Sequence, residues 1–170
     1  RTINRPKELA SDNSKIIDTI LHAVDFTKKV YGEYIENILL LQPTFPIRDY
    51  FEIKCAIDFF YKKDLSSLVS AINMKEHPCE CVTLSKKKYE WSFLVDPNKM
   101  TNRQSYPGEY LFINGNFYIS KIESLKKNKS FFSKKTNFFK CNSKYSIDID
   151  DINDFEYAEY CMLKLENISK

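Results

Sequence analysis

Two short apolar runs, each preceded by a helical pattern, constrain the fold of this chain more than any other feature. Residues 37–42 read "NILLLQ" and residues 66–74 read "SSLVSAINM", and both runs have the length of a strand. Residues 11–31 and 50–63 carry apolar side chains at helical spacing. The order helix, strand, helix, strand is typical of parallel strands joined by crossover helices, so we predict an α/β fold.

Capping residues and prolines indicate where these elements begin and end. Asp12 or Ser14 can cap the first helix and Asp49 the second, because a short side-chain oxygen accepts hydrogen bonds from free N–H groups at a helix start. The segment "QPTFPIRD" contains two prolines, which prevent strand pairing and indicate an ordered loop. Open sheets of this type bind ligands beyond the carboxyl ends of their strands, so residues 42–48 and 73–78 are the first site candidates.

The middle of the chain is richer in strand signals. Residues 81–95 predict a hairpin, and we interpret about 75–119 as a β-rich excursion from the α/β body. Within it, Asn114-Gly115 interrupts an apolar segment, which suggests a bulge or a close backbone approach. A short helix at 121–129, a strand at 136–141 and a final helix after residue 151 complete the pattern.

Composition excludes several classes of protein. The 170 residues, 43% of them apolar, are enough for the core of one domain. A net charge of +3 is too small to indicate a polyanion partner, and no apolar run approaches the roughly 20 residues of a membrane span. Five cysteines without a CxxC pair favour reduced thiols and a cytoplasmic location.

The lysine runs at 86–88, 126–129 and 134–135 are interpreted as solvated turns. A nucleic-acid-binding module that uses these lysines with Tyr and Phe is the alternative, although the aromatic residues follow burial patterns.

The acidic segment "SIDIDDIND" is the main candidate for chemistry. In an extended segment Asp148 and Asp150 project from the same side, and a hard divalent cation such as Mg²⁺ relieves the repulsion between their carboxylates. Asp151 and Asp154 suit a helix N-terminus, where the free N–H groups and the dipole favour negative charge. The spacing alone also fits, and slightly favours, four capping residues on a solvated turn.

Four further polar or aromatic positions are site candidates. Gln42 can hydrogen-bond sugar hydroxyls and Arg48 can bind a carboxylate or phosphate, although both also fit a plain connecting loop. Arg103 lies in "NRQSYP", a segment that also fits a surface loop. Tyr118 follows the Asn-Gly pair and fits a core position better than a ligand.

Taken in order, these pieces resemble the bacterial CMP-sialic acid synthetases, also called acylneuraminate cytidylyltransferases. The resemblance runs from Arg5 to about Leu163 through "RPKELASD", "LQPTFPIRD", "SLVSAINMKEHP", "NRQSYPGEYLFINGNFYI", "FFSKKT" and "SIDIDDINDFEYAE". It implies a Rossmann-like nucleotidyltransferase domain with a β-rich dimerisation arm. It also implies transfer of CMP from CTP to a nine-carbon α-keto acid sugar, with release of pyrophosphate, by a homodimer that needs neither nucleic acid nor a membrane.

The same resemblance assigns roles to particular residues. Asp148 and Asp150 match the Mg²⁺-binding aspartates, and Gln42 matches a residue that contacts the sugar acid. Arg103 matches an arginine of the arm that reaches anionic substrate groups, and Asp12 lies where the family approaches the nucleotide. The aromatic residues that match the lining of the sugar pocket are Tyr118, Phe131 and Phe132.

Two departures from the neuraminate-specific enzymes concern the sugar. Those enzymes carry an arginine just before the Asn-Gly pair, where this chain has Phe112, and a lysine after "EHP", where it has Glu80. The loss of two cations favours a less hydroxylated sugar of the legionaminate or pseudaminate type.

The start of the chain is also unlike the family. Residues 1–15 lack an initiator methionine and a signal-peptide pattern. The first strand and the CTP loop of the family precede anything in this sequence. We therefore expect a single domain over 1–170 that is incomplete at its N-terminus and that alone is inactive or nearly so. A catalytically silent dimeric relative is the alternative.

Overall fold

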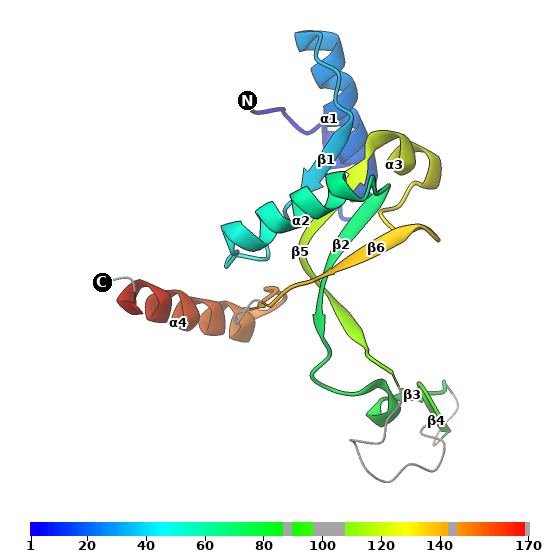
Figure 1. Cartoon of the computed structure of the whole chain (residues 1–170), viewed down its shortest axis with the longest axis vertical. Helices are drawn as coiled ribbons and strands as arrows, with labels where there is room; N and C mark the ends of the chain where they lie inside the picture. Colours follow the sequence, from blue (N-terminus) through cyan, green and yellow to red (C-terminus); the bar gives the residue numbers. More distant parts are fainter. Residues whose placement is uncertain (87–89, 97–107, 143–145, 169–170) are drawn as a thin grey trace.

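The computed structural model describes residues 1–86, 90–96, 108–142 and 146–168, which form a mixed sheet with helices on both faces (Figure 1). The sheet contains β1 (Asn37–Leu40), β2 (Ser67–Asn73), β5 (Leu111–Lys121) and β6 (Thr136–Lys140). The longer helices are α1 (Ile16–Tyr31), α2 (Tyr50–Lys62), α3 (Ile122–Asn128) and α4 (Ile152–Ile168). Two 3-10 turns (Lys7–Leu9 and Pro78–Glu80) and the strands β3 (Val82–Leu84) and β4 (Trp91–Phe93) complete the described elements.

The two predicted helices are present, but only one of them has the predicted cap. Asp49 Oδ1 accepts a hydrogen bond from the backbone N–H of Phe51 at 2.7 Å, which caps α2 as expected. The prediction for α1 was wrong, since neither Asp12 nor Ser14 caps it. Lys15 holds the N-cap position without a side-chain bond, and the hydroxyl of Ser14 instead donates to the carbonyl of Glu8.

The order of the strands corrects the predicted sheet. The order is β1-β5-β2-β6, and only β2 and β6 pair in parallel. The strands β1 and β2 do run in the same direction, but β5 lies between them and is antiparallel to both. The predicted excursion over about 75–119 therefore overlaps a central strand. Within that range β3 and β4 form a separate two-stranded antiparallel sheet.

An irregularity interrupts the pairing of β2 with β5. Val69 pairs with Tyr118 and Ala71 pairs with Ile113, so Ser70 alone faces residues 114–117. Ser70 Oγ accepts a hydrogen bond from the N–H of Phe117 at 3.0 Å, which holds the extra residues against the sheet. This confirms the bulge that the Asn-Gly pair suggested.

Alternate residues of the sheet face two helical layers. One face of the sheet packs against α1 and α3, through Ile17, Ile20, Leu21, Leu125, Val69, Ile38, Leu40 and Tyr118. The other face packs against α2, through Ala56, Phe60, Leu68, Phe117, Ile119 and Leu39. Residues next to each other in a strand thus enter opposite layers, as the strand pleat requires.

Two parts extend away from this body (Figure 1). The strands β2 and β5 continue as a two-stranded ribbon that leads to β3 and β4. The helix α4 lies to one side and packs through Ala158 and Cys161 against Ile147. Of the described helices, none has the length and apolar character needed to cross a bilayer.

Candidate functional site

Two loops meet at the carboxyl ends of the strands that run in parallel. The loop 42–48 follows β1, and the segment 146–150 comes after β6. The N–H of Ile149 donates a hydrogen bond to the carbonyl of Thr44 at 2.9 Å, so the proline-containing loop and the acidic segment lie side by side. This is the end of an open α/β sheet at which ligands bind.

The acidic segment alternates between core and solvent, as its sequence predicted. Ile147 is 6% exposed and packs with Ile149 against α4, while Asp148 and Asp150 are exposed. The packing of the isoleucines fixes the direction of the segment, and both carboxylates therefore lie on its solvent side.

Gly115 brings Asp148 close to Gln42. A Cβ placed on Gly115 would lie 3.0 Å from Asp148 Oδ2 and 3.1 Å from Gln42 Oε1. The backbone of Gly115 has a φ of +74°, a conformation that residues with a Cβ rarely adopt. The bulge in β5 therefore supplies both the room and the conformation that let a carboxylate and an amide meet above one glycine.

Arg48 holds these segments together rather than pointing at solvent. Its Nε donates to the carbonyl of Asn116 at 3.2 Å and its Nη2 donates to the carbonyl of Gln42. Its guanidinium lies 5.6 Å from the ring centre of Phe45, which is fully buried. Burial lowers the pKa of Arg48, and the negative charge of Asp148 opposes that change. Arg48 thus bridges the loop 42–48 and the bulge, and its charge lies near Asp148.

The three predicted pocket aromatics form one cluster. The ring of Tyr118 lies 5.2 Å from that of Phe131 and 6.4 Å from that of Phe132, measured between centroids. Phe131 is 5% exposed and belongs to the core beneath α1, whereas Phe132 is 46% exposed. Burial raises the pKa of Tyr118, and the nearby charge of Asp148 raises it further. The charge of Asp148 thus acts on the aromatic cluster through Tyr118.

A cavity of about 340 Å³ opens beside Asp148, and we call it the Asp148 cavity. The side chain of Asn114 donates a hydrogen bond to Ser146 Oγ at 3.0 Å at its polar end. The apolar part of its lining consists of Ile72, Met74 and Phe112. The predicted site segment 73–78 contributes residues 73–76 to this lining.

The carboxylates of Asp148 and Asp150 are ligands of the type that Mg²⁺ prefers. In the described part of the chain no group of three or more His, Cys, Asp or Glu side chains could hold an ion. Mg²⁺ commonly binds one or two carboxylates and completes its octahedron with waters and substrate phosphates. Asp148 and Asp150, exposed on the same segment, would be the residues that hold it.

Asp151 and Asp154 have the second role that the sequence predicted. Asp151 Oδ1 accepts hydrogen bonds from the N–H groups of Asn153 at 2.8 Å and Asp154 at 3.0 Å. Asp154 Oδ2 accepts in return from the N–H groups of Asp150 and Asp151. These two carboxylates cap α4 reciprocally, and the bonds from the N–H groups of Asp154 and Asn153 lower the pKa of Asp151.

Two predicted residues are not part of this arrangement. Asp12 lies in an exposed turn before α1. Arg103 lies outside the described residues, as do Gln104 and most of the predicted turn 86–88. Sequence reasoning in turn missed Asn114, Ser146 and the anchoring role of Arg48. The Asn114-Gly115 pair was the one sequence signal close to these residues.

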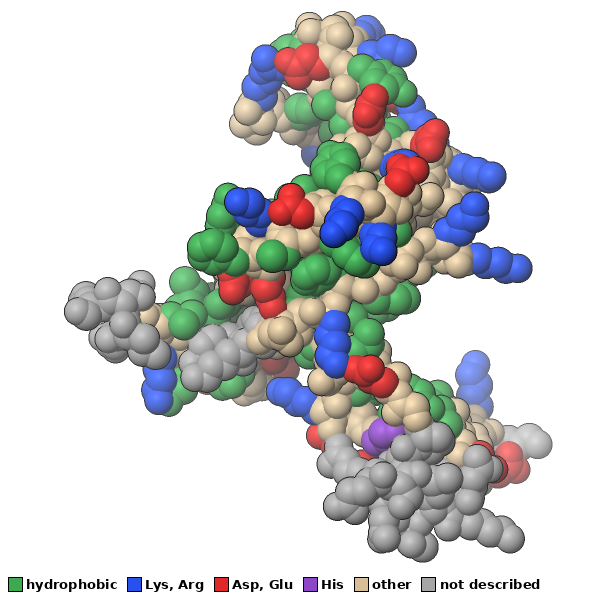
Figure 2. Space-filling model, in the orientation of Figure 1, with side chains coloured by type: hydrophobic (Ala, Val, Ile, Leu, Met, Phe, Trp, Pro, Cys, Tyr) green, Lys and Arg blue, Asp and Glu red, His purple; other side chains and the backbone are tan. Residues whose placement is uncertain are grey.

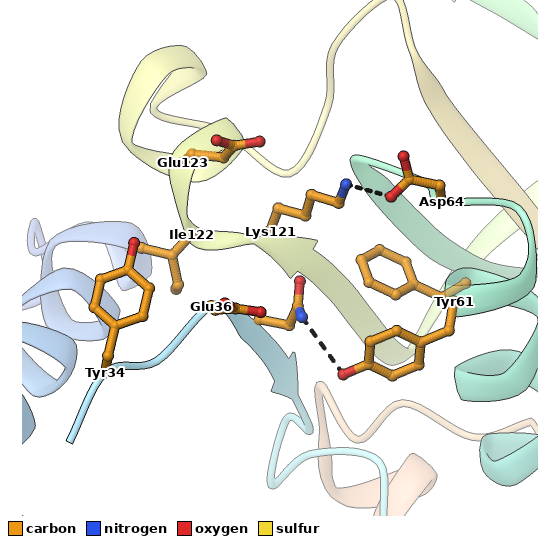
Figure 3. Close-up of a pocket in the computed structure, with 9 residues that line it drawn as sticks. Tyr34, Glu36, Tyr61, Asp64, Lys121, Ile122 and Glu123 are labelled. Carbon is orange, nitrogen blue, oxygen red and sulfur yellow. Dashed lines mark hydrogen bonds and ion pairs between the residues drawn. The ribbon is translucent and has the colours of Figure 1, made fainter.

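A second cavity lies at the opposite end of the sheet (Figure 3). It measures about 350 Å³, and we call it the Lys121 cavity. Lys121 Nζ is 2.6 Å from Asp64 Oδ1, and the carboxylates of Glu36 and Glu123 also line the space. The pairing with Asp64 raises the pKa of Lys121. This cavity contains none of the predicted site residues.

The chain is similar to curated proteins named as cytidylyltransferases and as a CMP-sugar acid synthase. It is 30% identical over 173 residues to the N-acylneuraminate cytidylyltransferase of Streptococcus agalactiae, covering 97% of this chain and 40% of that protein. It is 30% identical over 161 residues to the CMP-N,N'-diacetyllegionaminic acid synthase of Legionella pneumophila, covering 93% of this chain and 67% of that protein. The N-acylneuraminate cytidylyltransferase of Escherichia coli O18:K1:H7 is 30% identical over 154 residues, with 91% and 35% covered. The chain thus spans less than half the length of two of these relatives. No family model matches it.

Proposed function

This chain belongs to the acylneuraminate cytidylyltransferase family, and from that membership we propose that the protein transfers CMP from CTP to a nine-carbon α-keto acid sugar. Such a product serves the synthesis of bacterial surface glycans. The single observation that carries the proposal is the approach of Asp148 and Gln42 over Gly115. The family resemblance links Asp148 to the metal and the nucleotide, and Gln42 to the sugar, so the two substrates would meet at this point.

In a reaction of this type the protein mainly positions the two substrates so that the attacking and leaving oxygens are in line, and it forms no covalent bond itself. The oxygen of the sugar's anomeric hydroxyl attacks the α-phosphorus of CTP. The bond from that phosphorus to the oxygen bridging to the β-phosphorus breaks, pyrophosphate leaves, and the hydroxyl proton passes to solvent water. Asp148 and Asp150 would hold Mg²⁺, and the bound ion would neutralise part of the phosphate charge. Gln42 orients the sugar through its amide, and Tyr118 with Phe132 supports it from the side.

We propose that the sugar substrate is of the legionaminate or pseudaminate type. The apolar wall of the Asp148 cavity, made by Ile72, Met74 and Phe112, supports this assignment because it suits deoxy and acyl groups better than hydroxyls. All activity assays use a protein that carries this chain together with the family's CTP loop. In that protein, parallel turnover assays with legionaminate, pseudaminate and N-acetylneuraminate should give the lowest kcat/KM for neuraminate. A highest value for neuraminate would remove the assignment.

The protein is further proposed to be a cytoplasmic homodimer. All five cysteines are free thiols, which agrees with a reducing compartment. The arm formed by β3 and β4 exposes large apolar side chains, which support its use as the dimer contact. The family resemblance implies that Arg103 reaches anionic substrate groups across the dimer. Nucleic acid and membranes have no part in this proposal.

Asp148→Asn tests the proposed chemistry directly. The substitution keeps the size of the side chain but removes the charge that would hold Mg²⁺, so several kcal/mol of charge stabilisation are lost. We expect the release of pyrophosphate from CTP and sugar to slow by at least about 100-fold. Asp58→Asn, the same change on the exposed face of α2, is the matched control. Wild-type rates for Asp148→Asn would contradict the assignment of Asp148.

A further inference from the structure

Two lysine-rich segments that are separate in sequence come together around one cavity. The cavity measures about 500 Å³ and lies between α3 and the turn that precedes β6. Lys127 comes from α3, while Lys134 and Lys135 come from the turn. We call this space the lysine cavity. Figure 2 shows several Lys and Arg side chains along the right edge of the molecule, on the side where Figure 1 places α3 and β6. The sequence alone indicated only solvated turns here.

The cavity lies at the end of the sheet away from Asp148. Ser66 comes just before β2, and Ser133 to Lys135 come just before β6. These two strands are parallel, so their starts lie at one end of the sheet, whereas Asp148 comes after the end of β6. The lysine cavity is therefore separate from the proposed active site. Its neighbour is the acidic Lys121 cavity, with which it shares Glu123.

The backbone that carries the two turn lysines is held firmly. The N–H of Ser133 donates to Thr136 Oγ1 at 2.7 Å, and the N–H of Lys135 donates to Ser133 Oγ at 3.2 Å. Thr136 Oγ1 donates in turn to the carbonyl of the buried Phe131 at 3.0 Å. The turn is thus fixed to the core, and only the lysine side chains must become ordered when a ligand binds.

The three lysines of this cavity differ from their neighbours in charge pairing. Lys121 pairs with Asp64 at 2.6 Å and Lys126 pairs with Asp25 at 3.4 Å. For Lys127, Lys134 and Lys135 no carboxylate of the described chain lies within ion-pairing distance. Three ammonium groups against the one carboxylate of Glu123 leave the lining positive.

We propose that the lysine cavity binds the phosphate group of a small phosphorylated molecule. Ammonium groups at the rim and the half-buried hydroxyls of Ser66, Ser124 and Ser133 supply the donors that phosphate oxygens accept. Its volume lies within the usual range for small-molecule sites. Among the described residues that line it none is aromatic, so it lacks the stacking surface of a single-strand nucleic-acid site. This inference does not depend on the proposed function.

Calorimetric titration with inorganic pyrophosphate tests the site. EDTA is included so that no metal bridges pyrophosphate to Asp148. We expect the variant Lys127→Ala/Lys134→Ala/Lys135→Ala to bind at least about tenfold more weakly than wild type, since three charge-assisted contacts are lost. The matched control is Lys15→Ala/Lys28→Ala/Lys29→Ala, which removes the same charge from the exposed ends of α1. We expect less than about a threefold change there, the share of long-range charge alone.

Three outcomes would overturn the inference. Equal weakening in both triple variants would show that only net charge matters, and absence of pyrophosphate binding to wild type would show that there is no site. Tighter binding of a short oligothymidylate than of pyrophosphate, lost in the cavity variant, would identify a nucleic-acid surface instead. Circular dichroism of each variant checks that it is folded, and the exposed position of all six lysines predicts that it is.

Discussion

At the scale of single residues, Gly115 shapes the proposed site. It has a φ of +74° and lies under the side chains of Asp148 and Gln42. Arg48 then fixes the surrounding backbone by donating to the carbonyls of Asn116 and Gln42. The carboxylate of Asp148 and the amide of Gln42 come from distant segments, and the backbone around Gly115 is enough to place them together.

Gly115→Ala should reduce activity more than stability. The left-handed backbone costs an alanine roughly 1–2 kcal/mol, and the new methyl group would displace Asp148 and Gln42 by a few tenths of an ångström. Gly32→Ala is a close control, because Gly32 has a φ of +69° and nothing within 4 Å of its Cβ position. Urea unfolding should show similar losses in the free energy of unfolding for both variants. Only Gly115→Ala should lose kcat/KM, by about tenfold or more.

An equal effect of the two substitutions on kcat/KM would mean that Gly115 matters only for backbone conformation. The shared contact with Asp148 and Gln42 would then have no functional role.

At the scale of elements, the position of Cys141 at the end of β6 determines the pKa of its thiol. The pairing of β6 with β2 continues one residue beyond the strand, because the N–H of Cys141 donates to the carbonyl of Ala71 at 2.8 Å. This brings Cys141 into the layer beneath α2, where it is 4% exposed. Burial, followed by the negative charge of Glu52, raises the pKa of Cys141 to about 12.

Cys141 should therefore resist alkylation at pH 8, because only the thiolate reacts. Cys55 lies on the exposed side of α2 and serves as an internal control. We expect iodoacetamide to label Cys55 at least about 100-fold faster, as measured by mass spectrometry of peptides. Comparable labelling of both cysteines in the folded protein would contradict the buried position of Cys141.

The raised pKa of Cys141 also makes the free energy of unfolding depend on pH. The folded state keeps Cys141 protonated while the unfolded chain loses that proton above about pH 8.5. The contribution of Cys141 to the free energy of unfolding is thus complete below that pH and is lost progressively as the pH rises toward 12. A Cys141→Ala variant should lack this alkaline decline.

At the scale of the whole molecule, the arm is the part least able to be stable alone. The strands β3 and β4 are three residues each and all their side chains are exposed. Leu84 is 81% exposed and Trp91 is 58% exposed. A hairpin of this size is marginal in water without further burial. This supports the proposed contact between two copies of the chain.

Leu84→Asp should convert the proposed dimer to a monomer, because it places a charge in an apolar contact. Multi-angle light scattering after gel filtration measures the mass. Val30→Asp, a similar change at a 52% exposed position on α1, should leave the dimer intact. A monomeric wild-type protein, or dissociation by Val30→Asp as well, would exclude this interface.

The sequence by itself determined the features that depend on near neighbours in the chain. Asp49 caps α2, and Asp151 with Asp154 caps α4, because capping joins residues only two or three positions apart. The alternation in "SIDID" placed Ile147 inside and Asp148 outside, since successive side chains of an extended segment point to opposite sides.

Only the tertiary structure decided which distant segments meet. The strand β5 inserts between β1 and β2, although the local pattern equally fitted two neighbouring parallel strands. Two other long-range pairings likewise have no local signal: Arg48 donates a hydrogen bond to the carbonyl of Asn116, and Lys127 shares a cavity with Lys134. Such pairings depend on the free energy of packing the whole sheet with its helices, and no window of local sequence contains that quantity.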